Sequence, residues 1–523
     1  MPKFYPNLLF ITVFFTGAAV LIFEITAVRA LSPFFGTSIF VVSSVLSVIL
    51  AALSVGYYVG GRLADRYPDP RLLYLLIATS GLIMNALYWL ALYVFPLAGL
   101  ILPITFGPLI LAILFFFVPA FLLGIDSPFV IKLLTKTADE AHNGAVVGST
   151  FFWSTIGSIL GSLASGFYLI PFMGVRLTIV GTATLLSIGA CLAFLYIHPT
   201  TRHHRPYIPP TWLFAVSLVS VLLGALTIRS AGLDTRTDTL LWRGDGFYSQ
   251  IEIRERTLPD RQVLRSMYRE VNNSSSLLLG TTTFAFPYAE FARAHELLDV
   301  PVERYLVIGG GAYTVPRTLI LENDTVIVDV VELEPKLFPL AQTFFDIPTS
   351  SRLTNYTQDA RTFLARTDKV YDVIFLDAFN SGHYIPPHLI THEFFSLVQS
   401  RLSSDGILVA NVIGQTHQSG LSFAGSALHT IHSIFPNLAV YTVNPGAKQQ
   451  LQNLMVIARP NPVLPVALPP DTILPTSQRT FVTADELYIN LADFHFANQT
   501  IFTDDRAPVE YLVGKQIATS RSR

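Results

Sequence analysis

The sequence predicts an N-terminal bundle of about seven transmembrane helices, followed by a C-terminal α/β domain with a small β subdomain. Apolar residues make up 51% of the 523-residue chain and charged residues only 13%, which is too apolar for an ordinary soluble protein. The apolar excess ends near Ile228, and β-rich runs then alternate with helical stretches. The two halves of the chain are therefore expected to be adapted to two different solvents.

Long apolar runs predict the membrane half. A helix needs roughly 20 consecutive apolar residues to cross the hydrocarbon core of a bilayer. Such runs occupy residues 8–31, 38–59, 72–94, 108–123, 147–170, 177–197 and 211–228. The first run is too long for a cleaved signal peptide, so we expect it to stay in the chain. These runs indicate an integral multi-pass protein whose partner is the lipid bilayer, with the cell membrane as its expected location.

A short basic segment follows the second run. Its sequence, Gly61-Arg62-Leu63-Ala64-Asp65-Arg66, resembles the loop signature of the major facilitator transporters. The motif is short, and seven spans are too few for a complete transporter of that family. The helical half therefore has some major-facilitator-like character, and a transport role stays open.

The remainder of the chain is predicted to contain strands. We divide the sequence into a transmembrane domain (1–230), a small β subdomain with its connector (240–300) and a final domain (301–523). In the final domain, apolar runs alternate with helical stretches, which indicates a mostly parallel sheet covered by helices on both faces. The predicted strands are residues 305–308, 326–331, 373–376, 407–411, 439–443 and 454–458.

Candidate ligand-binding residues lie at the ends of these strands, where such sheets bind their ligands. The first strand runs into Gly309-Gly310-Gly311, and glycines let the backbone turn sharply and approach a ligand closely. Glu332 ends the second strand, where a carboxylate can accept both ribose hydroxyls of a nucleoside. Asp359 is expected to follow a third strand, for which no bounds are predicted, and Asp377 ends the next one, residues 373–376. Helix capping would explain any one of these acids, but it explains all three together less well.

Four motifs resemble, in order and spacing, the core motifs of the spermidine synthases, including their membrane-fused branch. They are Val307-Ile308-Gly309-Gly310-Gly311, Val331-Glu332-Leu333-Glu334-Pro335, Gln358-Asp359-Ala360 and Tyr371-Asp372-Val373-Ile374-Phe375-Leu376-Asp377. The resemblance covers roughly residues 240–512 and implies a Rossmann-type, methyltransferase-like domain. Enzymes of this family transfer an aminopropyl group from decarboxylated S-adenosylmethionine to putrescine and leave methylthioadenosine.

The resemblance also implies roles for individual residues. Asp377 would accept the proton of the attacking amine, Glu332 would hold the ribose and Asp359 the adenine amino group. The glycine turn and Ala360 would complete the nucleoside site. Tyr288 and Gln250 would bind substrate. No metal and no tightly bound cofactor are expected. The co-substrate would be decarboxylated S-adenosylmethionine or S-adenosylmethionine, and the partners a small-molecule nucleoside and an amine.

Several positions depart from the family pattern. Soluble spermidine synthases have acidic residues where this chain has Phe284, Ala285, Ala312 and Asn380. Tyr248 is followed by Ser249 instead of glutamine, and Gln250 comes one place later, on the opposite strand face. A doubly charged diamine in a closed pocket needs compensating carboxylates. These losses therefore argue against putrescine as the acceptor.

The leading hypothesis is a membrane-bound, spermidine synthase-like transferase that moves an aminopropyl group to an amine acceptor. One alternative is a transporter or sensor whose C-terminal domain binds a nucleoside or polyamine without catalysis. Another is an S-adenosylmethionine-dependent methyltransferase, because the same sheet and acids would serve it. The net charge of −2 gives no concentrated basic face, so no nucleic-acid partner is expected. A homodimer stays open.

Overall fold

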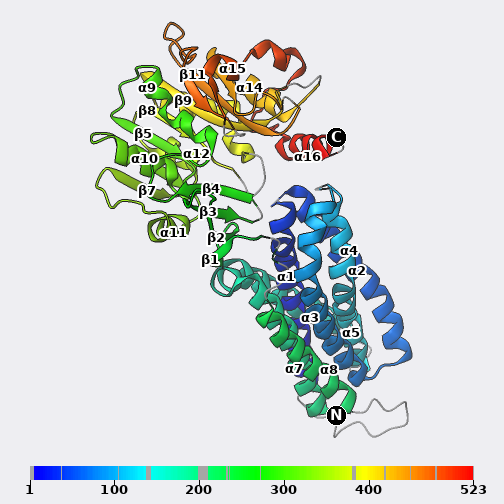
Figure 1. The fold of residues 1–523 in the computed structure, drawn as a ribbon. Helices are drawn as coiled ribbons and strands as arrows, with labels where there is room; N and C mark the ends of the chain where they lie inside the picture. The colour runs from blue at the N-terminus through cyan, green and yellow to red at the C-terminus, as the bar shows by residue number, and fades with distance from the viewer. Residues whose placement is uncertain are drawn as a thin grey trace. The chain divides into compact units, whose positions relative to one another are not determined.

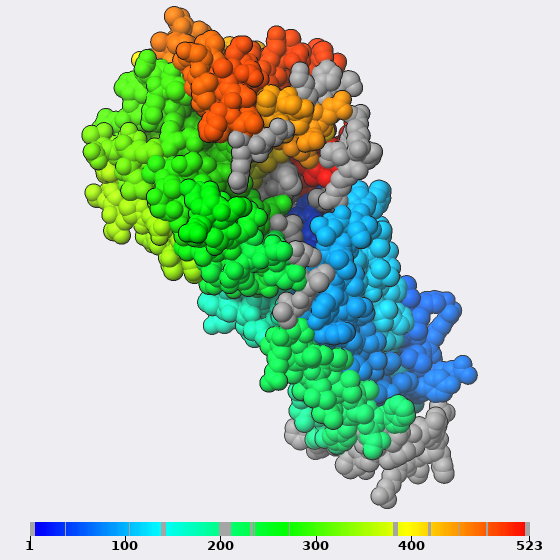
Figure 2. All heavy atoms as spheres, in the orientation of Figure 1, coloured from blue at the N-terminus to red at the C-terminus, as the bar shows by residue number. Residues whose placement is uncertain are grey.

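The protein divides into two compact units, Met1–Arg236 and Thr237–Arg523. The structure is a computed structural model (Figures 1 and 2). It describes residues 5–521 apart from residues 37, 104, 137–142, 198–209, 231–233, 235, 271, 380–384, 417–419, 448 and 477–479. Within these described residues, the first unit is helical and the second carries the strands.

Apolar helices build the first unit, coloured blue to green in Figure 1. They are α1 (Tyr5–Phe35), α2 (Ile39–Arg66), α3 (Pro70–Ile101), α4 (Gly107–Gly124), α5 (Asp126–Thr135), α6 (Asn143–Ala164), α7 (Ile170–Ile197) and α8 (Pro210–Arg229). In the described part of the chain, six helical stretches are long and apolar enough to cross a membrane. The sequence predicts about seven spans, so one of the six stretches is expected to contain two of them.

The fifth stretch, Asn143–Ile197, contains two of the predicted runs. Its 55 residues would extend about 80 Å as one straight helix, far more than the hydrocarbon core of roughly 30 Å. The stretch consists of α6, a π-helical turn (Ser165–Leu169) and α7. Gly174, at φ 80° and ψ 167°, interrupts the helical backbone inside α7. The predicted runs 147–170 and 177–197 therefore lie on either side of a break at a glycine.

Close backbone contacts and interhelical hydrogen bonds join the helices of this unit. Gly161 of α6 faces α1, and a Cβ at this position would come within 2.7 Å of the Cα of Ala18. Asn85 of α3 donates to the hydroxyl groups of Thr184 in α7, at 3.2 Å, and Ser220 in α8, at 3.0 Å. Small residues and side-chain hydrogen bonds of this kind hold helices together where lipid removes the hydrophobic driving force.

The segment Gly61–Arg66, expected in a loop after the second span, is helical and forms the end of α2. The helix continues because Tyr67 donates its backbone N–H to the carbonyl of Leu63, and Asp65 pairs with Lys132 at 2.6 Å. The loop placement was therefore wrong, and the major-facilitator-like character stays a prediction.

A four-stranded antiparallel sheet begins the second unit, in agreement with the predicted small β subdomain. Its strands are β1 (Thr239–Asp245), β2 (Gln250–Thr257), β3 (Val263–Arg269) and β4 (Asn272–Leu278). Glu334, which lies just after a strand of the larger sheet, accepts a hydrogen bond from the backbone N–H of Tyr248 at 3.0 Å. The small sheet is thus tied to the edge of the larger sheet at which the strands end.

In the described part of the second unit, the larger sheet has eight strands in the order β14-β10-β11-β9-β8-β5-β6-β7. Its strands are β5 (Arg304–Ile308), β6 (Ile327–Glu332), β7 (Leu353–Thr357), β8 (Tyr371–Leu376), β9 (Leu402–Gly414), β10 (Asn437–Thr442), β11 (Gln452–Arg459) and β14 (Tyr488–Ile489). Strands β5 to β9 pair in parallel, and β11 pairs antiparallel to β9 and β10. The mostly parallel sheet is therefore confirmed. Because β5 lies between β6 and β8, the strand order reverses there, which is where such sheets bind ligands.

Helices connect the strands, and further short elements complete the second unit (Figure 1). The helices are α9 (Ala294–Leu297), α10 (Thr314–Glu322), α11 (Leu337–Phe344), α12 (Ala360–Arg366), α13 (His392–Ser400), α14 (Phe423–Ile434), α15 (Ala484–Leu487) and α16 (Val509–Arg521). The short elements are the strands β12 (Ile473–Pro475) and β13 (Phe481–Thr483) and the 3-10 helices η4 (Pro287–Arg293), η5 (Pro387–Leu389), η6 (Leu491–Phe494) and η7 (Phe496–Asn498). Strand β8 and most of β9 are buried, so the core of this unit lies along the middle of the sheet.

Candidate functional site

A cavity of about 380 Å³ opens at the carboxyl ends of the parallel strands. Its wall includes the ends of β5, β6 and β8, the start of α12, and residues of β3 and β4. Of the predicted site residues, those in the wall are Tyr288, Gly309, Gly310, Gly311, Glu332, Asp359, Ala360 and Asp377. The fold thus brings predicted site residues that are far apart in the sequence to one cavity.

The glycine turn after β5 needs at least one true glycine. Gly309 has φ +96° and Gly311 has φ +52°, a region of backbone space that L side chains rarely adopt. A Cβ on Gly309 would lie 2.8 Å from the carbonyl carbon of Asp377. The absence of a side chain at Gly309 lets the turn after β5 approach the backbone at Asp377 closely.

Glu332 is held in place by the backbone around it. Its side chain is buried, and Oε2 accepts a hydrogen bond from the N–H of Gly310 at 2.9 Å. Oε1 accepts from the N–H of Glu334 at 2.8 Å. A carboxylate has about four acceptor positions, so two remain for hydroxyl groups of a ligand. The carboxylate is therefore oriented in advance of binding.

Asp359 has two partners of its own. It is the N-cap of α12, and Oδ1 accepts from the backbone N–H of Thr362 at 2.9 Å. Oδ2 lies 2.7 Å from Nε2 of His388, a residue of η5. Burial raises the pKa of Asp359, but the hydrogen bonds from Thr362 and His388 outweigh it, so the net shift is downward. The carboxylate of Asp359 thus both caps α12 and forms part of the cavity wall.

Asp377 is the cavity carboxylate whose pKa is shifted upward. Its Oδ2 accepts a hydrogen bond from the Tyr288 hydroxyl at 3.1 Å, and Oδ1 accepts from Nδ2 of Asn411 at 2.8 Å. Asn411 in turn accepts from Asn453 at 3.0 Å, which fixes its orientation. Burial raises the pKa of Asp377 to about 6, although the hydrogen bonds from Asn411 and Tyr288 lower it. The group can therefore gain or lose a proton near neutral pH.

The hydroxyl of Tyr288 keeps its proton near neutral pH. Burial, followed by the nearby charge of Asp377, raises the pKa of the Tyr288 hydroxyl well above its ordinary value. The hydroxyl therefore remains a donor toward Oδ2 of Asp377. The ring of Phe286 stacks on Tyr288 with the ring centroids 5.9 Å apart, which restricts the orientation of the phenol.

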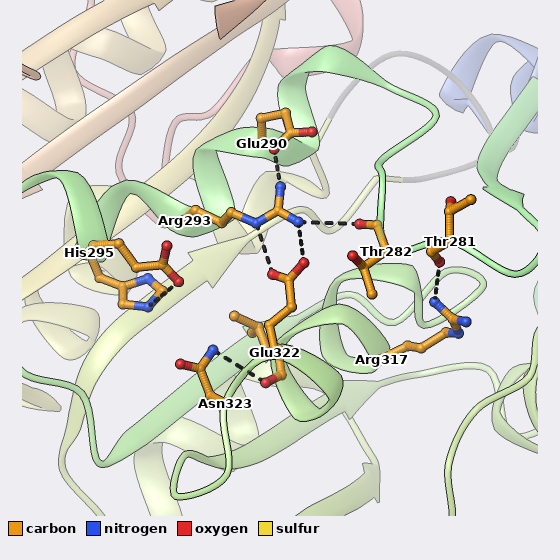
Figure 3. A network of polar contacts seen from close by, with 10 residues as sticks. Thr281, Thr282, Glu290, Arg293, His295, Arg317, Glu322 and Asn323 are labelled. Carbon is orange, nitrogen blue, oxygen red and sulfur yellow. Dashed lines mark hydrogen bonds and ion pairs between the residues drawn. The ribbon is translucent and has the colours of Figure 1, made fainter. Parts of the chain in front are cut away.

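A polar network holds the segment that carries Tyr288 (Figure 3). Arg293 of η4 donates to Glu322 at the end of α10, at 2.7 Å, and also pairs with Glu290. The same guanidinium donates to the carbonyl of Thr282 at 3.2 Å and lies 4.7 Å from the ring centre of Phe284. Phe284, at a position that is acidic in soluble spermidine synthases, thus packs under an arginine.

The other predicted positions that the structure describes lie outside the cavity wall. Gln250, which the structure describes, lies outside the cavity wall, and its backbone N–H donates to Glu270 at 3.1 Å. The described residues Phe284, Ala285 and Ala312 are also absent from the wall. Asn380 falls outside the described residues. A substrate-binding role for Gln250 stays a prediction.

Sequence reasoning missed several residues of the wall, among them Arg269, His388, Asn411 and Asn453. Asn411 carried a usable signal, because a polar residue that ends an apolar run in a buried strand needs a partner. Arg269 and His388 carried none, since each reaches the cavity only through the packing of the second unit.

Comparison with known proteins agrees with this geometry. Residues 292–461 match the family model of the spermine/spermidine synthase domain. The C-terminal unit contains a spermine/spermidine synthase domain. The matched range includes the glycine turn and the three cavity acids, whereas Tyr288 and Arg269 precede it.

Relatives of this spermine/spermidine synthase domain include polyamine aminopropyltransferases. One, from Vibrio vulnificus, is 40% identical over 129 residues, which cover 24% of this chain and 43% of that protein. A probable polyamine aminopropyl transferase from Bifidobacterium longum is 25% identical over 300 residues, covering 52% and 62%. Polyamine aminopropyltransferase 2 from Streptomyces coelicolor is 25% identical over 427 residues, covering 76% and 72%. The chain thus spans about half the length of the first two relatives.

Among solved structures, that of a probable spermidine synthase from Corynebacterium glutamicum is 26% identical to this chain. It covers 42% of this chain and 80% of its own, with a TM-score of 0.37.

Proposed function

We propose that this protein transfers an aminopropyl group from decarboxylated S-adenosylmethionine to an amine. The observation that carries the proposal is Asp377, a carboxylate with a pKa of about 6 beside a glycine turn and an oriented acid. The spermine/spermidine synthase domain and the names of its relatives support the same class of reaction.

The proton transfer would be carried out by Asp377. An ammonium has no lone pair, so the amine must lose a proton before it attacks the carbon next to the sulfonium. Asp377 accepts that proton, the new N–C bond forms, and the C–S bond breaks with its electron pair returning to sulfur. The products are the aminopropylated amine and neutral methylthioadenosine. Tyr288 and Asn411 hold the carboxylate in position.

The nucleoside would lie across the ends of β5, β6 and α12. The two free acceptor positions of Glu332 suit the ribose hydroxyls, and Asp359 with Ala360 lies on the side that would meet the adenine. The turn Gly309–Gly311 allows the backbone to contact the ligand directly. No metal enters this scheme.

The helical unit supports a location in a lipid bilayer, with the cell membrane as our proposal. The six apolar stretches have lengths that match or exceed a span. A homodimer and the domain limits 1–230, 240–300 and 301–523 remain part of the same proposal.

The test uses the full-length protein in detergent micelles. Release of methylthioadenosine from decarboxylated S-adenosylmethionine is measured with a panel of amines, and calorimetry measures binding of methylthioadenosine. Asp377→Asn should reduce release at least about a hundredfold and leave methylthioadenosine binding within about threefold. Binding without release for every amine would favour the transporter or sensor hypothesis instead.

A methyltransferase is the second candidate. One relative, the N-terminal histidine N-methyltransferase of Emericella nidulans, is 35% identical over 142 residues, although these cover only 24% of that protein. The same assay with S-adenosylmethionine separates the two reactions, because methyl transfer releases S-adenosylhomocysteine in place of methylthioadenosine.

A further inference from the structure

A cation faces the cavity at the end of β3. Arg269 lies in the wall, half-buried, with Nε donating to the hydroxyl of Ser249 at 3.2 Å and Nη1 to the carbonyl of Phe379 at 3.5 Å. No described carboxylate pairs with it, and no described contact involves Nη2. A guanidinium that is partly desolvated and lacks a counter-charge is costly unless a ligand supplies one.

The acids of the cavity are already engaged elsewhere. Among the described wall residues the carboxylates are Glu332, Asp359 and Asp377. Each contacts two hydrogen-bonding partners of the protein itself. The wall next to Arg269 is instead formed by neutral side chains, those of Asn272, Asn273, Ser274 and Ser275. The side of the cavity formed by β3 and β4 is therefore positive, and the nucleoside side is negative.

Arg269 lies close in space to the segment that carries Asp377, the proposed acceptor of the amine's proton. The carbonyl that Nη1 approaches belongs to Phe379, two residues after Asp377 along the chain. A diamine whose first nitrogen reaches Asp377 would carry its second, charged nitrogen toward this region and meet a like charge. A carboxylate in place of that second nitrogen would meet two parallel N–H donors, the arrangement that arginine provides best.

We infer that Arg269 binds a carboxylate of the substrate, so that the acceptor is an amine of the amino-acid type and not a diamine. This inference rests on the proposed function for the identity of the reacting amine. A carboxylate could also come from S-adenosylmethionine that has not been decarboxylated. The recognition chemistry is the same in both cases, and the source can be decided by measurement.

The experiment compares the full-length wild type in detergent with Arg269→Gln and Arg269→Glu. Calorimetry with methylthioadenosine present measures the binding of 4-aminobutanoate and of 1,4-diaminobutane, which differ in the group at one end. A second series measures S-adenosylmethionine against its decarboxylated form. Arg256→Gln is the matched control, because Arg256 lies on β2 of the same sheet with an exposed side chain that pairs with Asp238.

We expect the wild type to favour a carboxylated ligand and Arg269→Gln to weaken its binding about tenfold to a hundredfold, as for a charged hydrogen bond. Arg269→Glu should reverse the preference toward 1,4-diaminobutane. Loss confined to 4-aminobutanoate supports the inference, whereas loss confined to S-adenosylmethionine would place the carboxylate on the donor and overturn the assignment of an amino-acid acceptor. The control should change neither series.

The inference would be overturned if every Arg269 substitution changed the affinities for carboxylated and uncarboxylated ligands equally, within twofold. Tighter binding of 1,4-diaminobutane by the wild type would also overturn it. Because these measurements need binding only, their result is separate from the proposed function, which fails if no methylthioadenosine is released from any amine. Circular dichroism checks that each variant is folded, and Arg269→Lys, which keeps the charge, should retain part of the preference.

Discussion

The hydroxyl of Tyr288 donates to Oδ2 of Asp377 across 3.1 Å, although the two residues lie 89 positions apart in the sequence. Tyr288 belongs to η4 and Asp377 follows β8, so the contact joins the connector after the small sheet to the centre of the large sheet. Tyr288 can therefore orient the carboxylate of Asp377, the proposed base, only while η4 is packed against the large sheet.

Removing this hydroxyl should change the acidity of the base. The hydrogen bond from Tyr288 lowers the pKa of Asp377, so Tyr288→Phe should raise that pKa above its value of about 6. We expect the acidic limb of the profile of kcat/KM against pH to move upward, with a rate loss of about twofold at pH 7 for a rise of about one pKa unit. An acidic limb that stays in place in a folded Tyr288→Phe protein would contradict this assignment.

The wild type should itself lose activity in acid. A base must be ionised to accept a proton, and burial holds the pKa of Asp377 near 6. Below that pH, kcat/KM should fall about tenfold for each pH unit. Steady-state rates between pH 4.5 and 8 measure this limb. Methylthioadenosine binding, followed over the same range, should not follow the limb, since Asp377 is not assigned to hold the nucleoside.

Glu332→Gln should weaken nucleoside binding. The amide oxygen can still accept from one backbone N–H, but the NH₂ group faces either a second backbone donor or the ribose hydroxyls that the carboxylate would accept. We expect affinity for methylthioadenosine to fall about tenfold to a hundredfold in calorimetry. Asp471→Asn, at an exposed position, makes the same chemical change away from the cavity and should leave affinity unaltered.

Two glycine substitutions should separate backbone strain from steric overlap. Gly280 has φ +76° with open space around its Cβ position, whereas Gly309 has φ +96° and a Cβ there would overlap the backbone at Asp377. Gly280→Ala should cost about 1 kcal/mol, since only the left-handed conformation opposes it. Gly309→Ala should cost clearly more and also abolish nucleoside binding. Thermal denaturation and calorimetry measure the two effects, and equal losses of stability would exclude the overlap.

The strand ends could be predicted because burial leaves a pattern in the sequence. Strands β5, β6 and β8 are largely apolar, so Glu332, the last residue of β6, and Asp377, directly after β8, stand out as acids at strand ends. Strand β7 gave no such run, because it forms the sheet edge, where its residues are only partly buried. Its end could be placed only through Asp359.

The cavity wall could be predicted only in part, for a different reason. Arg269 lies at the end of an antiparallel strand, Val263–Arg269, whose sequence marks no residue as a ligand. Its approach to Phe379 depends on how the small sheet packs against the large one. Contacts of this type follow from tertiary structure, and a linear pattern contains no record of them.

The break at Gly174 has a consequence for any mutational scan of the helical unit. Residues on one face of a continuous helix recur with a period of 3.6, and a scan normally uses that period to assign lipid-facing positions. The non-helical φ and ψ at Gly174 reset the rotational phase of the chain. Substitution effects in α6, before the π-helical turn Ser165–Leu169, and in α7 after Gly174 should therefore fit two separate periodic curves. One curve fitted across residues 143–197 would assign lipid-facing and buried positions wrongly in one of these two helices.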